Sequence, residues 1–66
     1  MTIRVNESLR EFSSTLTLQE LINELQVQAN GIAVAVNENV IKKENWNSYK
    51  LRGNDNVLII KSTQGG

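Results

Sequence analysis

The chain has 66 residues, which is the size of one small domain. It contains no Cys and no His, so disulfides, a thiolate nucleophile, Cys-ligated zinc and the commonest general base are all excluded. Seven Lys and Arg balance seven Asp and Glu, so no basic field is present to attract a nucleic-acid backbone. We therefore do not expect a stand-alone enzyme, a metal site or a nucleic-acid-binding protein.

Apolar runs in the chain are far shorter than the roughly 20 residues of a membrane span. The first residues, Met1 to Arg4, lack the apolar stretch of a signal peptide. The expected location is the cytoplasm, with no membrane partner.

Alternation of polar and apolar residues predicts a first strand at residues 2–5. Residues 6–8 are typical of a turn, because Asn and Ser side chains bond to their own backbone. A second strand is expected at residues 10–13, with Phe12 facing inward.

The clearest pattern in the chain is an amphipathic helix over about residues 18–28. Its apolar residues recur at the spacing i, i+3, i+4 and i+7, which are Leu18, Leu21, Ile22 and Leu25. Leu21 and Ile22 are therefore expected to be fully buried. Thr17 and Glu20 form a capping box at the start of the helix, and Asn30-Gly31 is a plausible stop.

After the helix, the continuous apolar run at residues 32–36 predicts a buried strand. A turn at 37–39 leads into residues 40–41, which gives a hairpin. Residues 49–51 are a short strand candidate. Residues 57–61 are apolar up to Lys61 and are expected to form a central strand.

This order of elements predicts an α+β fold with a mixed sheet of four or five strands and one helix packed across one face. If the last strand is central, it runs parallel to the first, which is the layout of the ubiquitin-like β-grasp. We expect residues 1–61 to form the β-grasp domain and residues 62–66 to be a flexible tail ending in Gly-Gly.

No catalytic constellation is present in the sequence. The carboxylate pair Glu20 and Glu24 has helical spacing on the polar face, which is typical of a solvated surface. Trp46 lies near several Lys residues and could stack on a nucleic-acid base. The favoured interpretation is that Trp46 covers an edge of the core.

The terminal Gly65-Gly66 pair is the remaining feature with a chemical use. Glycine has no side chain and adopts unusual φ angles, so such an end can thread a narrow slot in a partner. Five residues follow Lys61 and span roughly 17 Å when extended. A partner could adenylate the terminal carboxylate, after which a sulfur or nitrogen nucleophile could displace AMP. The alternative is a free tail with no function.

The sequence resembles the ThiS-type sulfur-carrier proteins of thiamine biosynthesis, which are ubiquitin-like β-grasp proteins. The resemblance covers the whole chain and is carried by residues 17–22, 32–37 and 40–46 and by Gly65-Gly66. The chain departs from the family pattern where the family usually has Gly, at Glu38 and at Asn54. Asn tolerates positive φ, so the second turn can survive the change.

The resemblance implies that an E1-like enzyme adenylates the Gly66 carboxylate with ATP and that the acyl group is converted to a thiocarboxylate. The sulfur donor would be a cysteine desulfurase or a rhodanese-type protein, and thiazole synthase would receive the sulfur. Gly66 would be the carrier residue, Gly65 and Gln64 would thread into the partners, and the chain itself would hold no cofactor.

Three other functions fit parts of the sequence. A molybdopterin-type sulfur carrier and a ubiquitin-like protein modifier both need Gly66, whereas a pure binding module with an incidental Gly-Gly end does not.

Overall fold

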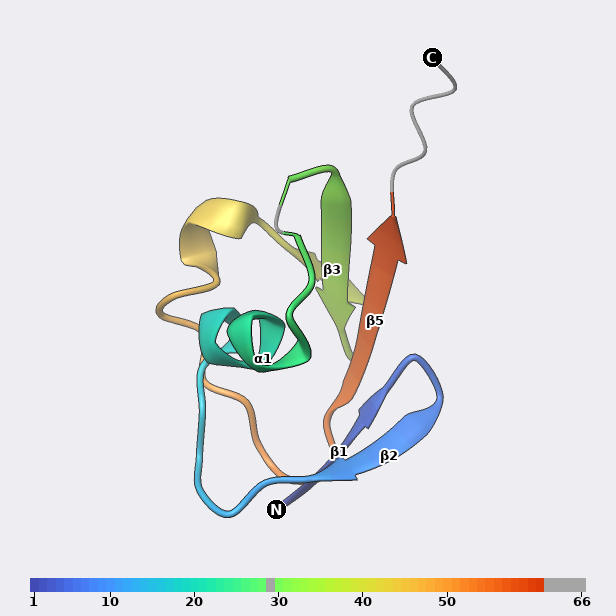
Figure 1. Cartoon of the computed structure of the whole chain (residues 1–66), viewed down its shortest axis with the longest axis vertical. Helices are drawn as coiled ribbons and strands as arrows, with labels where there is room; N and C mark the ends of the chain where they lie inside the picture. The colour runs from blue at the N-terminus through green and yellow to red at the C-terminus, as the bar shows by residue number, and fades with distance from the viewer. Residues whose placement is uncertain (29, 62–66) are drawn as a thin grey trace.

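The computed structural model describes residues 1–28 and 30–61 and contains a five-stranded mixed sheet with one helix (Figure 1). The elements are β1 (Thr2–Val5), β2 (Ser8–Glu11), α1 (Leu18–Leu25), β3 (Ile32–Val36), β4 (Asn39–Ile41), the 3₁₀ turn η1 (Lys43–Asn45) and β5 (Asn56–Lys61). The strand order is β2-β1-β5-β3-β4, with β1 and β5 parallel and the other neighbours antiparallel. The predicted β-grasp fold with a central last strand is confirmed.

The core lies between α1 and one face of the sheet. Its fully buried members come from α1, from β1, β3 and β5, and from the long connection before β5: Ile3, Val5, Leu18, Leu21, Ile22, Val34, Val36, Trp46, Leu51 and Val57. Leu21 and Ile22 are 0% and 1% exposed, as the apolar stripe predicts. Removal of this apolar surface from water is the main force that holds the domain together, because the chain has no disulfide to assist it.

The helix starts as predicted and ends earlier than predicted. Thr17 and Glu20 form the complete capping box, with the Glu20 N–H donating to Thr17 Oγ1 at 3.2 Å and the Thr17 N–H donating to Glu20 Oε1 at 2.8 Å. The expected stop at Asn30-Gly31 is wrong. Gln26 takes the left-handed conformation with φ 58°, and its N–H donates to the Asn23 carbonyl at 3.1 Å. This geometry closes the helix at Leu25 without a glycine.

The β1–β2 hairpin also differs from the prediction, because β2 begins at Ser8 and not at residue 10. Asn6 and Glu7 both have positive φ, 48° and 70°, so the loop is a tight turn of two residues. Phe12 follows the strand and packs against the core from the edge, in agreement with its expected inward orientation.

The strand expected at residues 49–51 is wrong. This segment forms a single bridge between Lys50 and Thr17. The Leu51 N–H donates to Leu16 at 2.9 Å, and the Leu18 N–H donates to Tyr49 at 2.8 Å. Its partner is thus the entrance to a helix, where the chain turns away, so the pairing cannot extend into a ladder.

Trp46 is buried, with 1% of its surface exposed, so it cannot stack on a base. Its indole Nε1–H donates to the Ile41 carbonyl at 2.9 Å, which satisfies the one polar atom of the ring inside the core. The favoured interpretation of Trp46 as a cover for the core edge is confirmed.

The β3–β4 turn places Glu38 in the left-handed region with φ 74°, after Asn37 with φ 51°. We expect Glu38→Gly to raise the free energy of unfolding by about 0.5–1 kcal/mol, because left-handed backbone costs a non-glycine residue about 1–2 kcal/mol and glycine recovers most of that cost. Urea denaturation with an unchanged m value is the measurement. The matched control is Glu44→Gly, which removes an exposed Glu of negative φ and should destabilise the protein. Equal effects of the two changes would contradict this account of the turn.

Candidate functional site

The predicted site residues Gln64, Gly65 and Gly66 lie outside the described residues. The structure describes the strand that precedes them in the chain. This strand is β5, which ends at Lys61. The surfaces on either side of β5 are those nearest to the predicted site in the described part of the chain.

β5 is paired with β3 over most of its length and with β1 only at its start. It pairs with β3 over five residue pairs, from Val36↔Val57 to Ile32↔Lys61, and with β1 at Arg4↔Asn56 and Val5↔Val57. β1 and β3 therefore clamp the start of β5 from either side. Among the described strands, β3 alone holds the rest of β5 in register, up to Lys61.

Two Asn side chains extend this clamp beyond the backbone ladders. Asn6 Oδ1 accepts from the Ile59 N–H at 2.8 Å, and Asn37 Oδ1 accepts from the Asn56 N–H at 3.0 Å. Asn37 Nδ2 also donates to Asp55 Oδ1 at 3.0 Å. Both Asn residues sit at the first position of a two-residue hairpin turn, so each joins a turn to β5. Sequence reasoning assigned these residues only to turns, because a bond across 53 residues leaves no local pattern.

The face of the sheet opposite α1 carries exposed apolar side chains. Leu58 and Ile60 of β5 are 46% and 48% exposed, and Val40 of β4 is 71% exposed. The sheet register joins them, because Ala35 pairs with both Leu58 and Val40, and Ala33 pairs with Ile60. These five residues form the open-face patch, which runs across three strands next to the end of β5; four of them are exposed, and Ala35 between them is 7% exposed. Continuous exposed apolar surface of this kind is typical of a protein-binding site.

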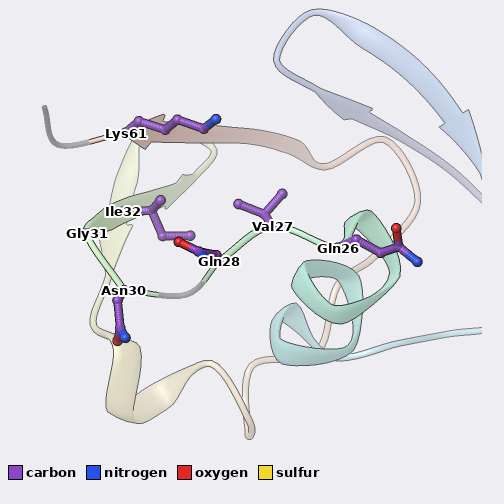
Figure 2. A pocket seen from close by; sticks show the side chains of 7 residues that line it. All are labelled: Gln26, Val27, Gln28, Asn30, Gly31, Ile32 and Lys61. Atoms are coloured by element: carbon purple, nitrogen blue, oxygen red, sulfur yellow. The ribbon is translucent and has the colours of Figure 1, made fainter.

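A hollow with a volume of about 460 Å³ lies beside Lys61, on the face of the sheet that carries α1. Figure 2 shows its walls, which are the segment after α1 with Val27 and Gln28, the start of β3 with Ile32, and Lys61 of β5. The lining mixes amide and aliphatic groups, with one positive charge from Lys61. The end of β5 is thus bordered by an apolar surface on one face of the sheet and by a partly polar hollow on the other.

Two other kinds of site are not found among the described residues. Over residues 1–28 and 30–61, no cluster of three or more acidic, His or Cys side chains could hold a metal ion. Over the same residues, no helix is long and apolar enough to cross a membrane. The carboxylates of Glu20 and Glu24 are exposed to solvent, as the helical spacing predicts.

Comparison with known proteins gives consistent results. The model of the ThiS family matches residues 3–66. The sulfur carrier protein ThiS of Escherichia coli (strain K12) is 26% identical over 66 residues, and the match covers all of both chains.

Two solved structures of a thiamine biosynthesis protein from Geobacter metallireducens are also similar. The crystal structure of this protein, named ThiS, superimposes with a TM-score of 0.88 at 26% identity over all of both chains. An NMR structure gives a TM-score of 0.80 at 25% identity, covering all of this chain and 88% of the other. A family match that spans nearly the whole chain, on a fold that superimposes end to end, shows that this chain belongs to the ThiS family of sulfur carriers in thiamine biosynthesis.

Proposed function

We propose that the carboxylate of Gly66 is the group that carries sulfur. An E1-like enzyme joins this carboxylate to the α-phosphate of ATP, and pyrophosphate leaves. The terminal sulfur of a donor persulfide attacks the acyl carbon, and AMP leaves. A thiol then cleaves the acyl disulfide, which yields the thiocarboxylate and a disulfide on the donor side. The thiocarboxylate delivers its sulfur to thiazole synthase.

The observation that carries this proposal is the family match, which runs to Gly66 and so includes the terminal Gly-Gly pair. The position of β5 supports it. Five residues separate Lys61 from Gly66, and an extended segment of that length spans roughly 17 Å. The carboxylate can therefore enter a partner's active site while the folded domain stays outside. Gly65 and Gln64 are proposed to pass through the entrance, where the absence of a side chain on Gly65 keeps the segment narrow.

In this proposal the chain supplies the reacting carboxylate and the partners supply the catalysis. ATP is a substrate of the adenylating enzyme, and the chain binds no cofactor of its own. A cysteine desulfurase or a rhodanese-type protein is proposed as the persulfide donor. The membership of a family of sulfur carriers fits this division of work.

We propose further that the open-face patch contacts the adenylating enzyme. The patch is next to the strand that leads into the tail, so a partner that covers it can receive the tail at the same time. The double variant Leu58→Ala/Ile60→Ala should weaken binding about tenfold or more, as expected for apolar residues at the centre of an interface. Isothermal titration calorimetry measures this effect. Leu9→Ala is the control, because Leu9 is also exposed but lies on β2, which β1 separates from β5. Equal losses from both variants would count against the patch.

Measurement of intact mass tests the carrier function. The protein is incubated with ATP, the adenylating enzyme of the same organism and a sulfur donor. A carrier gains the mass difference between sulfur and oxygen, located in the C-terminal fragment. A ubiquitin-like modifier instead appears as an adduct on a target Lys, and a binding module keeps its mass. Adding thiazole synthase or a molybdopterin synthase large subunit then shows which acceptor removes the sulfur, and we expect thiazole synthase.

A further inference from the structure

β5 extends well beyond its parallel neighbour β1. The two strands pair only at Arg4↔Asn56 and Val5↔Val57, after which the chain turns away at Asn6. The Asn6 side chain then bonds to Ile59, and Figure 1 shows no strand beside the remaining part of β5 on that side. From Ile59 onward, β5 therefore has β3 as a neighbour on one side. On the other side the described residues provide no neighbouring strand, so this side is an open edge.

Hydrogen-bond alternation gives the direction in which the Lys61 backbone points. The Asn56 carbonyl accepts from Asn37 on the β3 side, whereas the Val57 carbonyl accepts from the Asn6 N–H on the β1 side. Successive residues of a strand alternate, so odd-numbered residues of β5 direct their N–H and C=O groups away from β3. Lys61 accordingly presents its backbone groups to the open edge, where the described part of the chain provides no strand to pair with them. An unpaired edge of this kind is a template for another extended chain.

A groove of about 400 Å³ runs beside this edge on the helix side of the sheet. Its apolar part is formed by Val5, Leu25, Val27 and Ile59. Arg10 and Lys61 contribute positive charge, Ser8 is among the other lining residues, and the lining contains no Asp or Glu. An added strand alternates its side chains, so every second one would enter this groove. The lining fits an apolar side chain next to a carboxylate.

We propose that an extended segment of the adenylating enzyme pairs with the open edge of β5 at Lys61, with an apolar and an acidic side chain in the groove. The inference rests on the proposed function, because its partner is the enzyme that we propose adenylates Gly66. Five residues continue from Lys61 to Gly66, so a segment that pairs here lies at the start of the tail's path. Pairing at this point sets the direction in which the tail enters the active site.

Amide hydrogen exchange tests this pairing directly on the full-length protein. In the free protein the Lys61 amide should exchange rapidly, whereas the Ile59 amide, which is bonded to Asn6, should already be protected. Saturation with the adenylating enzyme should slow exchange at Lys61 about tenfold or more. Unchanged exchange at Lys61 in a saturated complex overturns the pairing. Protection that appears at high concentration of the chain alone assigns the edge to a second copy and also overturns the proposal.

A matched pair of variants separates the backbone bond from the side chain. Lys61→Pro removes the N–H on the open side, where proline is tolerated, and Lys61→Ala removes only the charged side chain. Lys61→Pro should bind the enzyme about tenfold more weakly than Lys61→Ala, the size expected for a lost backbone bond. Arg10→Ala should weaken binding and reduce its dependence on salt. Equal affinities of the two Lys61 variants contradict the edge pairing.

The test of the edge pairing can fail independently of the test of the carrier function. Exchange of radioactive pyrophosphate into ATP reports adenylation of Gly66, whether or not the edge is paired. Adenylation that depends on Gly66 together with an unprotected Lys61 amide rejects the edge pairing and leaves the carrier function in place. A protected Lys61 amide without adenylation rejects the carrier function and leaves the pairing.

Discussion

Deletion of Gly66 is expected to abolish formation of the sulfur-loaded product. The carboxylate would then lie one residue short, or about 3.3–3.6 Å, of the position where the partner adenylates it. A displacement of even about 1 Å at a reacting centre can reduce a rate 100-fold, so the loss should be essentially complete. Intact-mass measurement after incubation with ATP, the adenylating enzyme and a sulfur donor detects it. Full sulfur loading of the shortened chain would reject the carrier function.

The same deletion should leave the unfolding midpoint unchanged, because the last strand of the sheet is complete at Lys61. Gly65→Ala should give an intermediate rate, since it adds a Cβ in a narrow entrance and keeps the reach of the tail. Gly53→Ala is the matched control. A Cβ at Gly53 would meet only Met1 Cβ at 3.8 Å, an ordinary contact, and the residue lies in a turn before β5. Its sulfur loading should therefore equal that of the unaltered protein.

Leu21→Ala should cost about 2–5 kcal/mol of stability, the typical range for truncation of a buried Leu. Leu21 is 0% exposed and belongs to the core cluster under α1. A domain of this length has a total stability of roughly 3–10 kcal/mol, estimated at about 0.05–0.15 kcal/mol per residue. The variant should thus lose a large share of its stability, which far-UV circular dichroism with urea titration will show.

Leu58→Ala makes the same chemical change on the open face of the sheet, where Leu58 is 46% exposed. It leaves no closed cavity, so we expect a cost of less than about 1 kcal/mol. The ratio of the two effects measures how much of the stability depends on the helix–sheet core. Similar costs at the two positions would contradict the assignment of the core to the α1 side.

Local patterns predicted most of the fold correctly. The spacing of Leu18, Leu21 and Ile22 predicted both the helix and its buried face, and the capping box at Thr17 predicted its first residue. The apolar run at residues 57–61 predicted a central strand, and β5 is central in the sheet, although Leu58 and Ile60 on its open face are about half exposed. These features depend on neighbours in sequence, which is why they could be predicted.

Features that depend on tertiary contacts or on unusual backbone could not be predicted. Gln26 and Glu7 adopt the left-handed conformation without being Gly or Asn, so composition gave no sign of the helix end or of the tight first turn. Residues 49–51 were a strand candidate, but among the described residues they pair only with the segment around Thr17 that enters the helix. For the site, the Gly-Gly end was evident in the sequence, whereas the open edge at Lys61 depends on where β1 stops.

The central position of β5 also constrains the order of events during synthesis of the protein. β1 can pair with its parallel partner only after residues 56 and 57 have been synthesised. The hydrogen bond between Asn6 and Ile59 joins residues that are 53 positions apart in the sequence. Contacts of such long range form late, and the sheet cannot close around a missing middle strand. A chain truncated before this point lacks the strand that joins the two halves of the sheet, so it cannot fold and is open to proteolysis. Folding thus favours chains in which translation has proceeded through β5, to within a few residues of Gly66.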